Sequence, residues 1–320
     1  MRTLVIHTGG TIGMVQTAEG YAPQLGIVED CLVELHSMNK ITGDFELVVA
    51  DPLIDSGKAM PHDWNWIGGT ISDHYNDFDA FVVTHGSDTM AFTSCALSYA
   101  LEGLDKPVIL TGSMLPLTVQ NNDGLRNLTD AMNAVHDAGA GVWVQFAGRR
   151  LHGTRVRKSH SSAFDAFHDA AMDVPARRIV DAFKWQTYST FNVPVLAFTP
   201  GMDGEILEHC AERADGIVLR CYGSGTVPDL PELAPALGLA KKRHVPVIAT
   251  SQCAEGGVAL GTYAAGAALL EAGVIDGRDA TVEAVYTKLL YGLSKDSSEC
   301  DLRSTLAAPI CGEFARTILR

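Results

Sequence analysis

The sequence predicts an α/β protein of two domains, each built on a mostly parallel sheet with helices on both faces. The chain has 320 residues, and at about 150 residues per domain that length suggests two domains. Short, apolar, β-branched runs alternate with longer amphipathic ones, which is typical of parallel sheets covered by helices. Hydrophobic residues make up 47% of the chain, enough to fill sizeable cores, so a disordered chain is excluded.

The larger, N-terminal domain is expected to contain a doubly wound sheet. Its predicted strands are Leu4–Ile6, Phe81–Thr84, Val108–Thr111 and Val142–Phe146. Its predicted helices are 62–74, 88–101 and 123–138. Each strand is followed by a turn that contains glycine, as the β-α-β rhythm requires.

A second, smaller α/β domain is predicted after a linker. Residues 181–200 mix aromatic residues, threonine and proline without a helical period, and we place the linker at 184–193, between domains 1–183 and 194–320. The predicted strands of the second domain are Val195–Phe198, Gly216–Arg220 and Val245–Thr250. Its predicted helices are 230–242, 262–272, 281–292 and 298–308.

The charge balance narrows the range of partners. The chain carries 24 Lys and Arg residues against 38 Asp and Glu, a net charge of −14. Nucleic acids and anionic membranes need concentrated positive charge, so neither is expected as the main partner. A small zwitterionic substrate remains compatible, because it senses only the local field of its pocket.

Other sequence features favour a cytoplasmic protein without a metal site. Neither a signal peptide nor an apolar run of about 18 residues is recognisable, so no membrane span is expected. The seven cysteines are irregularly spaced and form no CxxC pair, which fits a reducing compartment. No HExxH motif and no His/Cys cluster with ligand spacing occurs, so no metal is expected.

Polar, glycine-containing segments follow the predicted strands and mark the first candidate site. They are HTGGT (7–11), THGSDT (84–89), TGSM (111–114) and YGSG (222–225). In open parallel sheets, ligands bind outside the carboxyl ends of the strands. We therefore expect these hydroxyl-bearing segments to face a ligand.

Thr11 has two interpretations. It is either an ordinary turn or N-cap residue, or a hydroxyl nucleophile on the loop behind the first strand. Gly9 and Gly10 would permit a sharp turn and close approach of a ligand to the main chain. The segment has neither the GxGxxG pattern of a dinucleotide loop nor the GK[ST] of a P-loop.

Ser87 and Asp88 also allow a structural and a functional interpretation. Ser87 could cap the following helix and Asp88 could complement its positive end. The same helix N-terminus could instead hold a carboxylate or a developing oxyanion. Ser87 can lose its proton only to a nearby base, and Lys158, which follows the fourth strand, is the candidate.

Several motifs together resemble those of the bacterial L-asparaginases, most closely the cytoplasmic, type I branch. The segments that carry the resemblance are HTGGTIGM (7–14), GYAP (20–23), PLIDSG (52–57), THGSDTMAFTSCALSYAL (84–101), KPVILTGSMLP (106–116), KSHSSAFDAF (158–167), CYGSG (221–225) and TSQCAEGGV (250–258). The resemblance covers nearly the whole chain. It implies hydrolysis of L-asparagine to L-aspartate and ammonia, with weaker activity on L-glutamine and no cofactor. It also implies the asparaginase fold, with a larger N-terminal and a smaller C-terminal domain, in homodimers or homotetramers.

The resemblance also assigns roles to residues of the first domain. Thr11 falls on the family's nucleophile, and Tyr21 on the tyrosine that covers the substrate and orients that threonine. Ser87, Asp88 and Lys158 fall on a second catalytic cluster. The remaining matched positions are implied to bind substrate: Asp55, Ser56 and Gly57 at its α-carboxylate and α-amino groups, and Ser113 through its main chain near the scissile amide.

The second domain carries weaker matches. Arg220, Ser251 and Cys253 align with a regulatory asparagine site of type I relatives, and ordinary packing at strand ends is the alternative. Glu255 aligns, across a gap, with a carboxylate that reaches the substrate site of a neighbouring subunit.

The sequence departs from the family pattern at three positions. The family usually has threonine at Ser87 and at Ser251, and glutamine or serine at Gly57. Loss of the methyl group at Ser87 leaves its rotamer freer, and any contact made by Gly57 must come from its main chain.

Two other functions remain open on the same fold. One is the ammonia-supplying subunit of a tRNA-dependent amidotransferase, which carries an extra N-terminal domain and needs an RNA-binding face. The other is a non-catalytic amino-acid sensor, for which loss of Thr11, Tyr21 or Lys158 would be expected.

Overall fold

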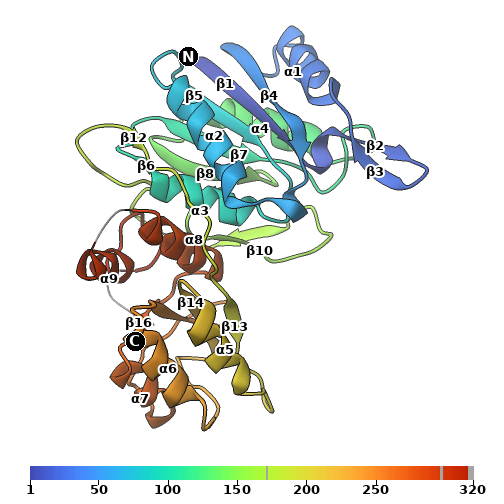
Figure 1. Ribbon diagram of the computed structural model, residues 1–320. Coiled ribbons are helices and arrows are strands. Elements are labelled where there is room, and N and C mark those ends of the chain that lie inside the picture. Colours follow the sequence, from blue (N-terminus) through green and yellow to red (C-terminus); the bar gives the residue numbers. More distant parts are fainter. Residues whose placement is uncertain (171, 296–297, 316–320) are drawn as a thin grey trace. The chain divides into compact units, whose positions relative to one another are not determined.

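The computed structural model divides the chain into two compact units, Met1–Thr187 and Tyr188–Arg320 (Figure 1). It describes residues 1–170, 172–295 and 298–315, so residues 316–320, the end of the predicted second domain, lie outside the described part. Each unit has its own parallel sheet, which confirms the predicted fold class. The limits of the predicted linker, 184–193, stay a prediction.

The first unit is organised around a six-stranded sheet. Its strands, in spatial order, are β4 (Asp44–Ile54), β1 (Arg2–Gly9), β5 (Ala80–Thr84), β7 (Pro107–Thr111), β8 (Gly141–Phe146) and β9 (Arg149–His152). The first five run parallel, and β9 pairs antiparallel with β8. The carboxyl ends of β4, β1, β5 and β7 therefore lie along one edge of the sheet.

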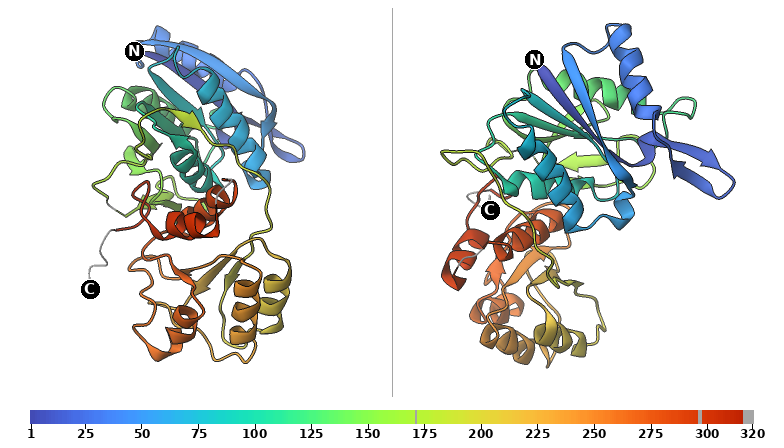
Figure 2. Two further views of the ribbon diagram at one scale, coloured as in Figure 1. Left: turned by 60° about the vertical axis from the view of Figure 1, so that its left-hand side comes forward. Right: turned by 45° about the horizontal axis from the view of Figure 1, so that its top comes forward.

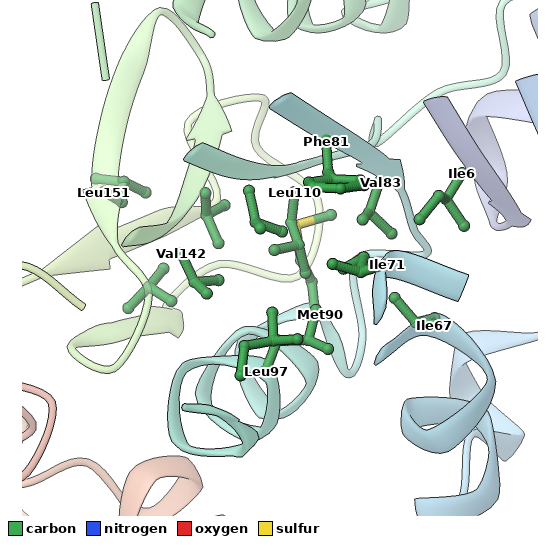
Figure 3. Close-up of a cluster of buried hydrophobic side chains, with 14 of the residues drawn as sticks. Ile6, Ile67, Ile71, Phe81, Val83, Met90, Leu97, Leu110, Val142 and Leu151 are labelled. Carbon is green, nitrogen blue, oxygen red and sulfur yellow. The ribbon is translucent and has the colours of Figure 1, made fainter. Parts of the chain in front are cut away.

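Helices cover both faces of this sheet, as the doubly wound prediction requires. Helices α1 (Ile27–Ser37) and α4 (Gly124–Ala134) bury their apolar residues with Val5 and Val82 on one face. On the other face, α2 (Pro61–Asp73) and α3 (Met90–Ala100) bury theirs against alternate residues of the same strands. Figure 3 shows this second core, in which Ile67, Ile71, Met90 and Leu97 meet Ile6, Phe81, Val83 and Leu110.

Smaller elements surround the sheet edge that carries the polar segments. A 3-10 turn, η1 (Thr11–Gly13), follows β1 and leads into the hairpin of β2 (Met14–Thr17) and β3 (Gly20–Pro23), which projects from the sheet in dark blue in Figure 2. A second 3-10 turn, η2 (Ser56–Lys58), follows β4. Strand β10 (Val156–Lys158) pairs with β11 (Phe167–Asp169), and β6 (Leu101–Glu102) pairs with β12 (Lys184–Trp185).

The second unit repeats the architecture with four strands. Its parallel sheet has the order β13 (Val195–Ala197), β14 (Ile217–Cys221), β15 (Val247–Ser251) and β16 (Ile275–Asp276). Helices α5 (Glu205–Arg213), α6 (Leu233–Lys242) and α7 (Ala264–Glu271) accompany α8 (Val282–Leu293) and α9 (Glu299–Ala307). Apolar residues of α5 and α6 form one core with β14 and β15.

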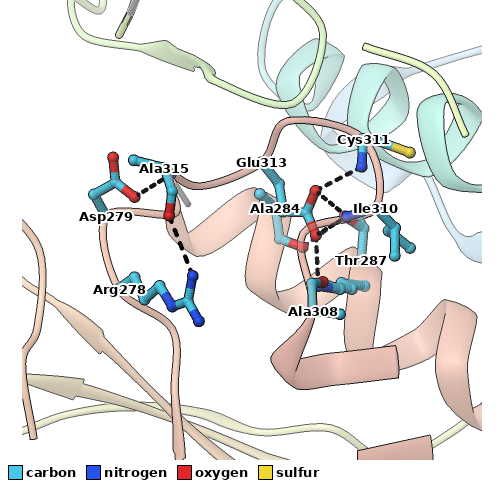
Figure 4. Close-up of polar contacts among 10 residues, drawn as sticks. Arg278, Asp279, Ala284, Thr287, Ala308, Ile310, Cys311, Glu313 and Ala315 are labelled. Carbon is cyan, nitrogen blue, oxygen red and sulfur yellow. Dashed lines mark hydrogen bonds and ion pairs between the residues drawn. The ribbon is translucent and has the colours of Figure 1, made fainter. Parts of the chain in front are cut away.

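A buried ion pair fastens the chain after α9 to α8. Lys288 Nζ lies 2.5 Å from a carboxylate oxygen of Glu313, and the two side chains are 3% and 1% exposed. The Glu313 carboxylate also accepts hydrogen bonds from the main-chain N–H groups of Ile310 and Cys311 (Figure 4). Burial lowers the pKa of the Lys288 ammonium, while the Glu313 charge opposes that shift.

The strands and helices predicted from the sequence are confirmed, with shifted ends. Strand β1 runs from Arg2 to Gly9 rather than from Leu4 to Ile6, and β15 begins at Val247 rather than Val245. Helices α1 and α5, strands β4, β9 and β16 and the short strand pairs were not predicted. Across the described ranges, no helix combines the length and apolarity that crossing a bilayer demands.

Candidate active site

Four loops meet at the carboxyl edge of the first sheet and carry most of the predicted site residues. Thr11 follows β1, Asp55 follows β4, Ser87 follows β5 and Ser113 follows β7. These strands are parallel neighbours, so their ends bring together segments far apart in the sequence. The polar segments HTGGT, THGSDT and TGSM of the first unit thus lie at one edge of the sheet; that they face a ligand stays a prediction.

Two glycines let these loops pack backbone to backbone. Gly10 has φ +84°, and a Cβ there would lie 2.4 Å from the main-chain nitrogen of Gly86. A Cβ on Gly86 would lie 2.2 Å from Ser56 Oγ. No side chain fits at either position, so the turn that begins at Thr11, the segment before Ser87 and the η2 turn are held against one another.

Hydrogen bonds also hold the η1 and η2 turns to neighbouring segments. The main-chain N–H of Leu117 donates to Ile12 O over 3.2 Å, and the Thr118 hydroxyl donates to Met14 O over 3.1 Å. The Thr89 hydroxyl donates to Ser56 O over 2.8 Å. The η1 turn is therefore anchored to the loop behind β7, and η2 to the start of α3.

Ser87, Asp88 and Lys158 form a contiguous cluster. Lys158 Nζ donates to Ser87 Oγ over 2.9 Å and lies 2.7 Å from Asp88 Oδ1. Ser87 is 7% exposed, whereas the side chains of Lys158 and Asp88 are 19% and 67% exposed. The cluster thus runs from a buried hydroxyl to a carboxylate that is open to a ligand.

The structure excludes the interpretation of Ser87 as a helix cap. Helix α3 begins at Met90, its N-cap is Thr89, and no side chain makes a capping hydrogen bond there. Ser87 lies outside the helix, and its hydroxyl contacts Lys158 instead.

Asp55 and its neighbours form a short polar turn at the same edge. The Asp55 carboxylate accepts a hydrogen bond from the main-chain N–H of Gly57 over 3.0 Å and lies 3.7 Å from Lys58 Nζ. Asp55 and Gly57 are exposed, whereas Ser56 is buried against Gly86. The carboxylate of Asp55 and the main chain of Gly57 are therefore the accessible groups of this turn.

Ser113 supplies a buried hydroxyl to the edge. Its side chain is 1% exposed, and its Oγ has no hydrogen-bond partner among the described residues. The next two main-chain N–H groups, those of Met114 and Leu115, donate to the Asp123 carboxylate. The loop is thereby held, while the Ser113 hydroxyl remains available.

Thr11 and Tyr21 belong to one continuous segment, the η1 turn and the hairpin after it. Thr11 is half-buried as the first residue of η1, and Tyr21 is 47% exposed on β3. The hairpin is tied back to the turn by the main-chain N–H of Gln24, which donates to Gly13 O over 2.9 Å.

Two buried histidines behind the edge were not found by sequence reasoning. The His7 ring bonds Thr84 Oγ1 through Nδ1 over 2.6 Å, and the His85 ring bonds Gly86 O over 2.7 Å. Burial lowers the pKa of both rings, and the charge of Glu29 partly opposes the shift at His7. A polar residue inside the apolar run of β1 was the available signal for His7.

The predicted residues of the second unit gather at the end of its own sheet. Arg220 on β14 lies opposite Thr250 on β15, and Ser251 ends that strand. The Ser251 hydroxyl donates to Gly223 O over 2.6 Å and accepts from the Cys253 N–H over 3.0 Å. Glu255 is exposed in the loop after β15.

No group of three or more potential metal ligands occurs within residues 1–170, 172–295 and 298–315. The chemistry available at the first sheet's edge is that of hydroxyls, carboxylates, the amino groups of Lys58 and Lys158, and main-chain N–H groups. Such a set suits attack on a carbonyl carbon with stabilisation of the resulting oxyanion.

Comparison with known proteins matches both units of the chain to one protein family. The family model "Asparaginase, N-terminal" matches residues 2–190, and "Glutaminase/Asparaginase C-terminal domain" matches residues 192–306. L-asparaginase 1 of Escherichia coli is 35% identical, with 97% of each chain covered.

Two solved structures are similar as well. The thermostable L-asparaginase from Thermococcus kodakarensis matches with a TM-score of 0.85 and 34% identity, covering 99% of this chain and all of that one. L-asparaginase I from Vibrio cholerae matches with a TM-score of 0.85 and 32% identity, covering 98% and 99% of the two chains. The sequence and structure comparisons thus agree over nearly the whole chain, and the chain belongs to the asparaginase family.

Proposed function

We propose that the chain hydrolyses the side-chain amide of L-asparagine to L-aspartate and ammonia, with Thr11 as the nucleophile. The observation that carries this proposal is the convergence of two groups from distant parts of the sequence. Gly10, the residue before Thr11, packs against Gly86, the residue before Ser87 of the Ser87–Asp88–Lys158 cluster. Membership of the asparaginase family and 35% identity to an L-asparaginase support the choice of substrate.

The exposed carboxylates suit the α-amino group of an amino acid. Asp88 is 67% exposed although Lys158 holds one of its oxygens, so it can accept a charge-assisted hydrogen bond from the ammonium group. Asp55 and the main chain of Gly57 lie in the η2 turn and would bind the α-amino and α-carboxylate groups together with Ser56.

An amide is a poor electrophile, so the attacking hydroxyl must lose its proton as the bond forms. In this proposal, Thr11 attacks the side-chain carbonyl carbon. Its proton passes to Tyr21 on the β2–β3 hairpin, whose hydroxyl gives its own proton on to water, or through water and Ser87 to Lys158 in its neutral amine form; Lys158 Nζ lies 2.9 Å from Ser87 Oγ. A proton is then returned to the amide nitrogen as the C–N bond breaks, so ammonia leaves, and water hydrolyses the ester formed on Thr11.

Main-chain N–H groups near Ser87 would stabilise the oxyanion of that intermediate. They belong to the segment between β5 and α3, which Gly10 and Ser56 hold in place. Each well-placed donor contributes roughly 3–4 kcal/mol to such a transition state. Ser113, whose buried hydroxyl has no partner among the described residues, would line the pocket beside the scissile amide.

The finer features follow the same family pattern. L-glutamine would be a weaker substrate, because its side chain is one methylene longer and such a difference changes binding by about 1–3 kcal/mol. Arg220, Ser251 and Cys253 would form a regulatory asparagine site, and Glu255 would reach the substrate site of a neighbouring copy in a homodimer or homotetramer. A cytoplasmic location fits the seven cysteines, none of which forms a disulfide in the described part of the chain.

Ammonia release tests the function directly. Purified protein is assayed over a range of L-asparagine concentrations, with L-glutamine in parallel. Stoichiometric ammonia and aspartate are expected, and a sigmoidal dependence would support the regulatory site. Asparagine-dependent thermal stabilisation without ammonia would instead favour an amino-acid sensor. Ammonia transfer that depends on charged tRNA would favour the amidotransferase subunit, which the net charge of −14 disfavours.

A further inference from the structure

The η1 turn rests on a buried polar ring. His7, near the end of β1, is 0% exposed. A Cβ on Gly13, the last residue of η1, would lie 3.2 Å from both Cε1 and Nε2 of that ring. One edge of the imidazole therefore packs directly beneath the turn whose first residue is Thr11.

The other ring nitrogen, Nδ1, which is bonded to Cε1, contacts the neighbouring strand. His7 Nδ1 lies 2.6 Å from Thr84 Oγ1, and the Thr8 hydroxyl donates to Thr84 O over 2.8 Å. Thr84 ends β5, three residues before Ser87. His7 thus connects the end of β5 to the turn behind β1.

Two buried polar atoms near the turn have no hydrogen-bond partner within the described residues. They are His7 Nε2 and Glu29 Oε2, the latter from the first turn of α1. The charge of Glu29 partly opposes the lowering of the His7 pKa by burial. A buried polar atom without a partner calls for an explanation beyond apolar packing, and the contact of this ring with Gly13 supplies one.

We propose that His7 is a positioning residue for the nucleophile turn. It links the end of β5 through its ring to Gly13 and so fixes the η1 turn, which begins with Thr11 directly after the contact of Gly10 with Gly86. The inference rests on the proposed role of Thr11. Small displacements of a reacting group are costly, since about 1 Å of misplacement can lower turnover about a hundredfold. His7 itself touches neither substrate nor reacting atoms in this scheme.

Three substitutions of His7 distinguish the contact of Nδ1 with Thr84 from the contact of the Cε1–Nε2 edge with Gly13. His7→Asn keeps a polar atom near Nδ1 for Thr84 but loses the edge under Gly13. His7→Gln places a polar atom near Nε2 and can refill that edge. His7→Phe keeps the ring volume and removes both polar atoms. We expect kcat to fall about ten- to hundredfold in the Asn and Phe variants, with KM changed less than about twofold, and to recover partly in the Gln variant.

A second readout does not depend on catalysis. The Gly13 N–H donates to Gly10 O over 3.2 Å within the turn, and its hydrogen exchange reports how firmly the turn is held. We expect faster exchange at Gly13 in His7→Asn than in wild type, while core amides of β5 exchange alike. A folded His7→Asn protein with wild-type kcat and wild-type exchange at Gly13 would overturn the proposal. If the wild type releases no ammonia, the function proposal fails, and the Gly13 exchange alone still decides the role of His7.

Discussion

Lys158 Nζ lies 2.9 Å from Ser87 Oγ, although 71 residues separate them in the sequence. The lysine lies at the end of strand β10, and the serine lies in the loop after β5. The ammonium group also contacts Asp88, so it is shared between a hydroxyl and a carboxylate. As a neutral amine Lys158 can accept a proton from Ser87, and as an ammonium it orients the Asp88 carboxylate.

Replacing Lys158 separates these two tasks. Lys158→Met removes both, and we expect kcat to fall about 10²- to 10⁴-fold, the usual contribution of a positioned acid–base group. Lys158→Arg keeps the positive charge beside Asp88 but stays protonated, so it should bind asparagine well and turn over slowly. Steady-state kinetics measure both. Near-normal kcat in the Met variant would make the cluster structural only.

Substitutions at Ser87 test whether kcat depends on the presence of the hydroxyl or on its exact position. Ser87→Ala removes the atom that Lys158 contacts, and we expect kcat to fall about a hundredfold or more. Ser87→Thr restores the methyl group usual in the family and restricts the rotamer, so its kcat should equal or exceed that of wild type. Equal activity of the Ala and Thr variants would contradict a role for this hydroxyl.

The buried Lys288–Glu313 pair governs stability in the second unit. Glu313→Gln leaves the Lys288 charge without its counterion in a site that is 3% exposed, and we expect unfolding to become easier by about 3–5 kcal/mol. The double variant Lys288→Met/Glu313→Leu removes both charges and should lose much less. Denaturant unfolding compares the three proteins. If the single and double variants lose the same free energy of unfolding, the contribution of this site to stability comes from packing and not from charge.

Stability should decline as pH falls, because burial lowers the native-state pKa of His7 and His85. Above the ordinary histidine pKa of about 6.5 both states are neutral and the rings contribute no pH dependence. Below it the unfolded chain binds protons that the native rings resist, so the free energy of unfolding decreases. Thermal unfolding between about pH 7 and 5 should show a shallower decline in His7→Asn than in wild type. Parallel curves would contradict this.

Much of the fold was predictable because its signals are local. Buried parallel strands such as Val108–Thr111 are short apolar runs, and the glycine turns after them mark where each ends. Strand β4 was missed because most of its residues are exposed or half-buried and because it contains two aspartates, Asp44 and Asp51. Helix α1 was missed because no side chain caps its start, and Gly26 precedes it in the left-handed region.

The candidate site was predictable only in part, for a related reason. Motif resemblance pointed to Ser87, Asp88 and Lys158, but no pattern in the sequence states that β10 returns to the end of β5. The backbone contact of Gly10 with Gly86 depends on the parallel pairing of β1 and β5. The place of His7 beneath Gly13 likewise depends on tertiary packing, which a single sequence does not reveal.

The role of Thr11 as the nucleophile is tested most directly by ammonia release from L-asparagine in the variant Thr11→Ala, with Thr11→Ser as the matched control. The Ala variant should fold, be stabilised by asparagine and lose at least about a thousandfold in kcat, while the Ser variant keeps measurable turnover. Turnover by Thr11→Ala within about tenfold of wild type would show that another group attacks the amide.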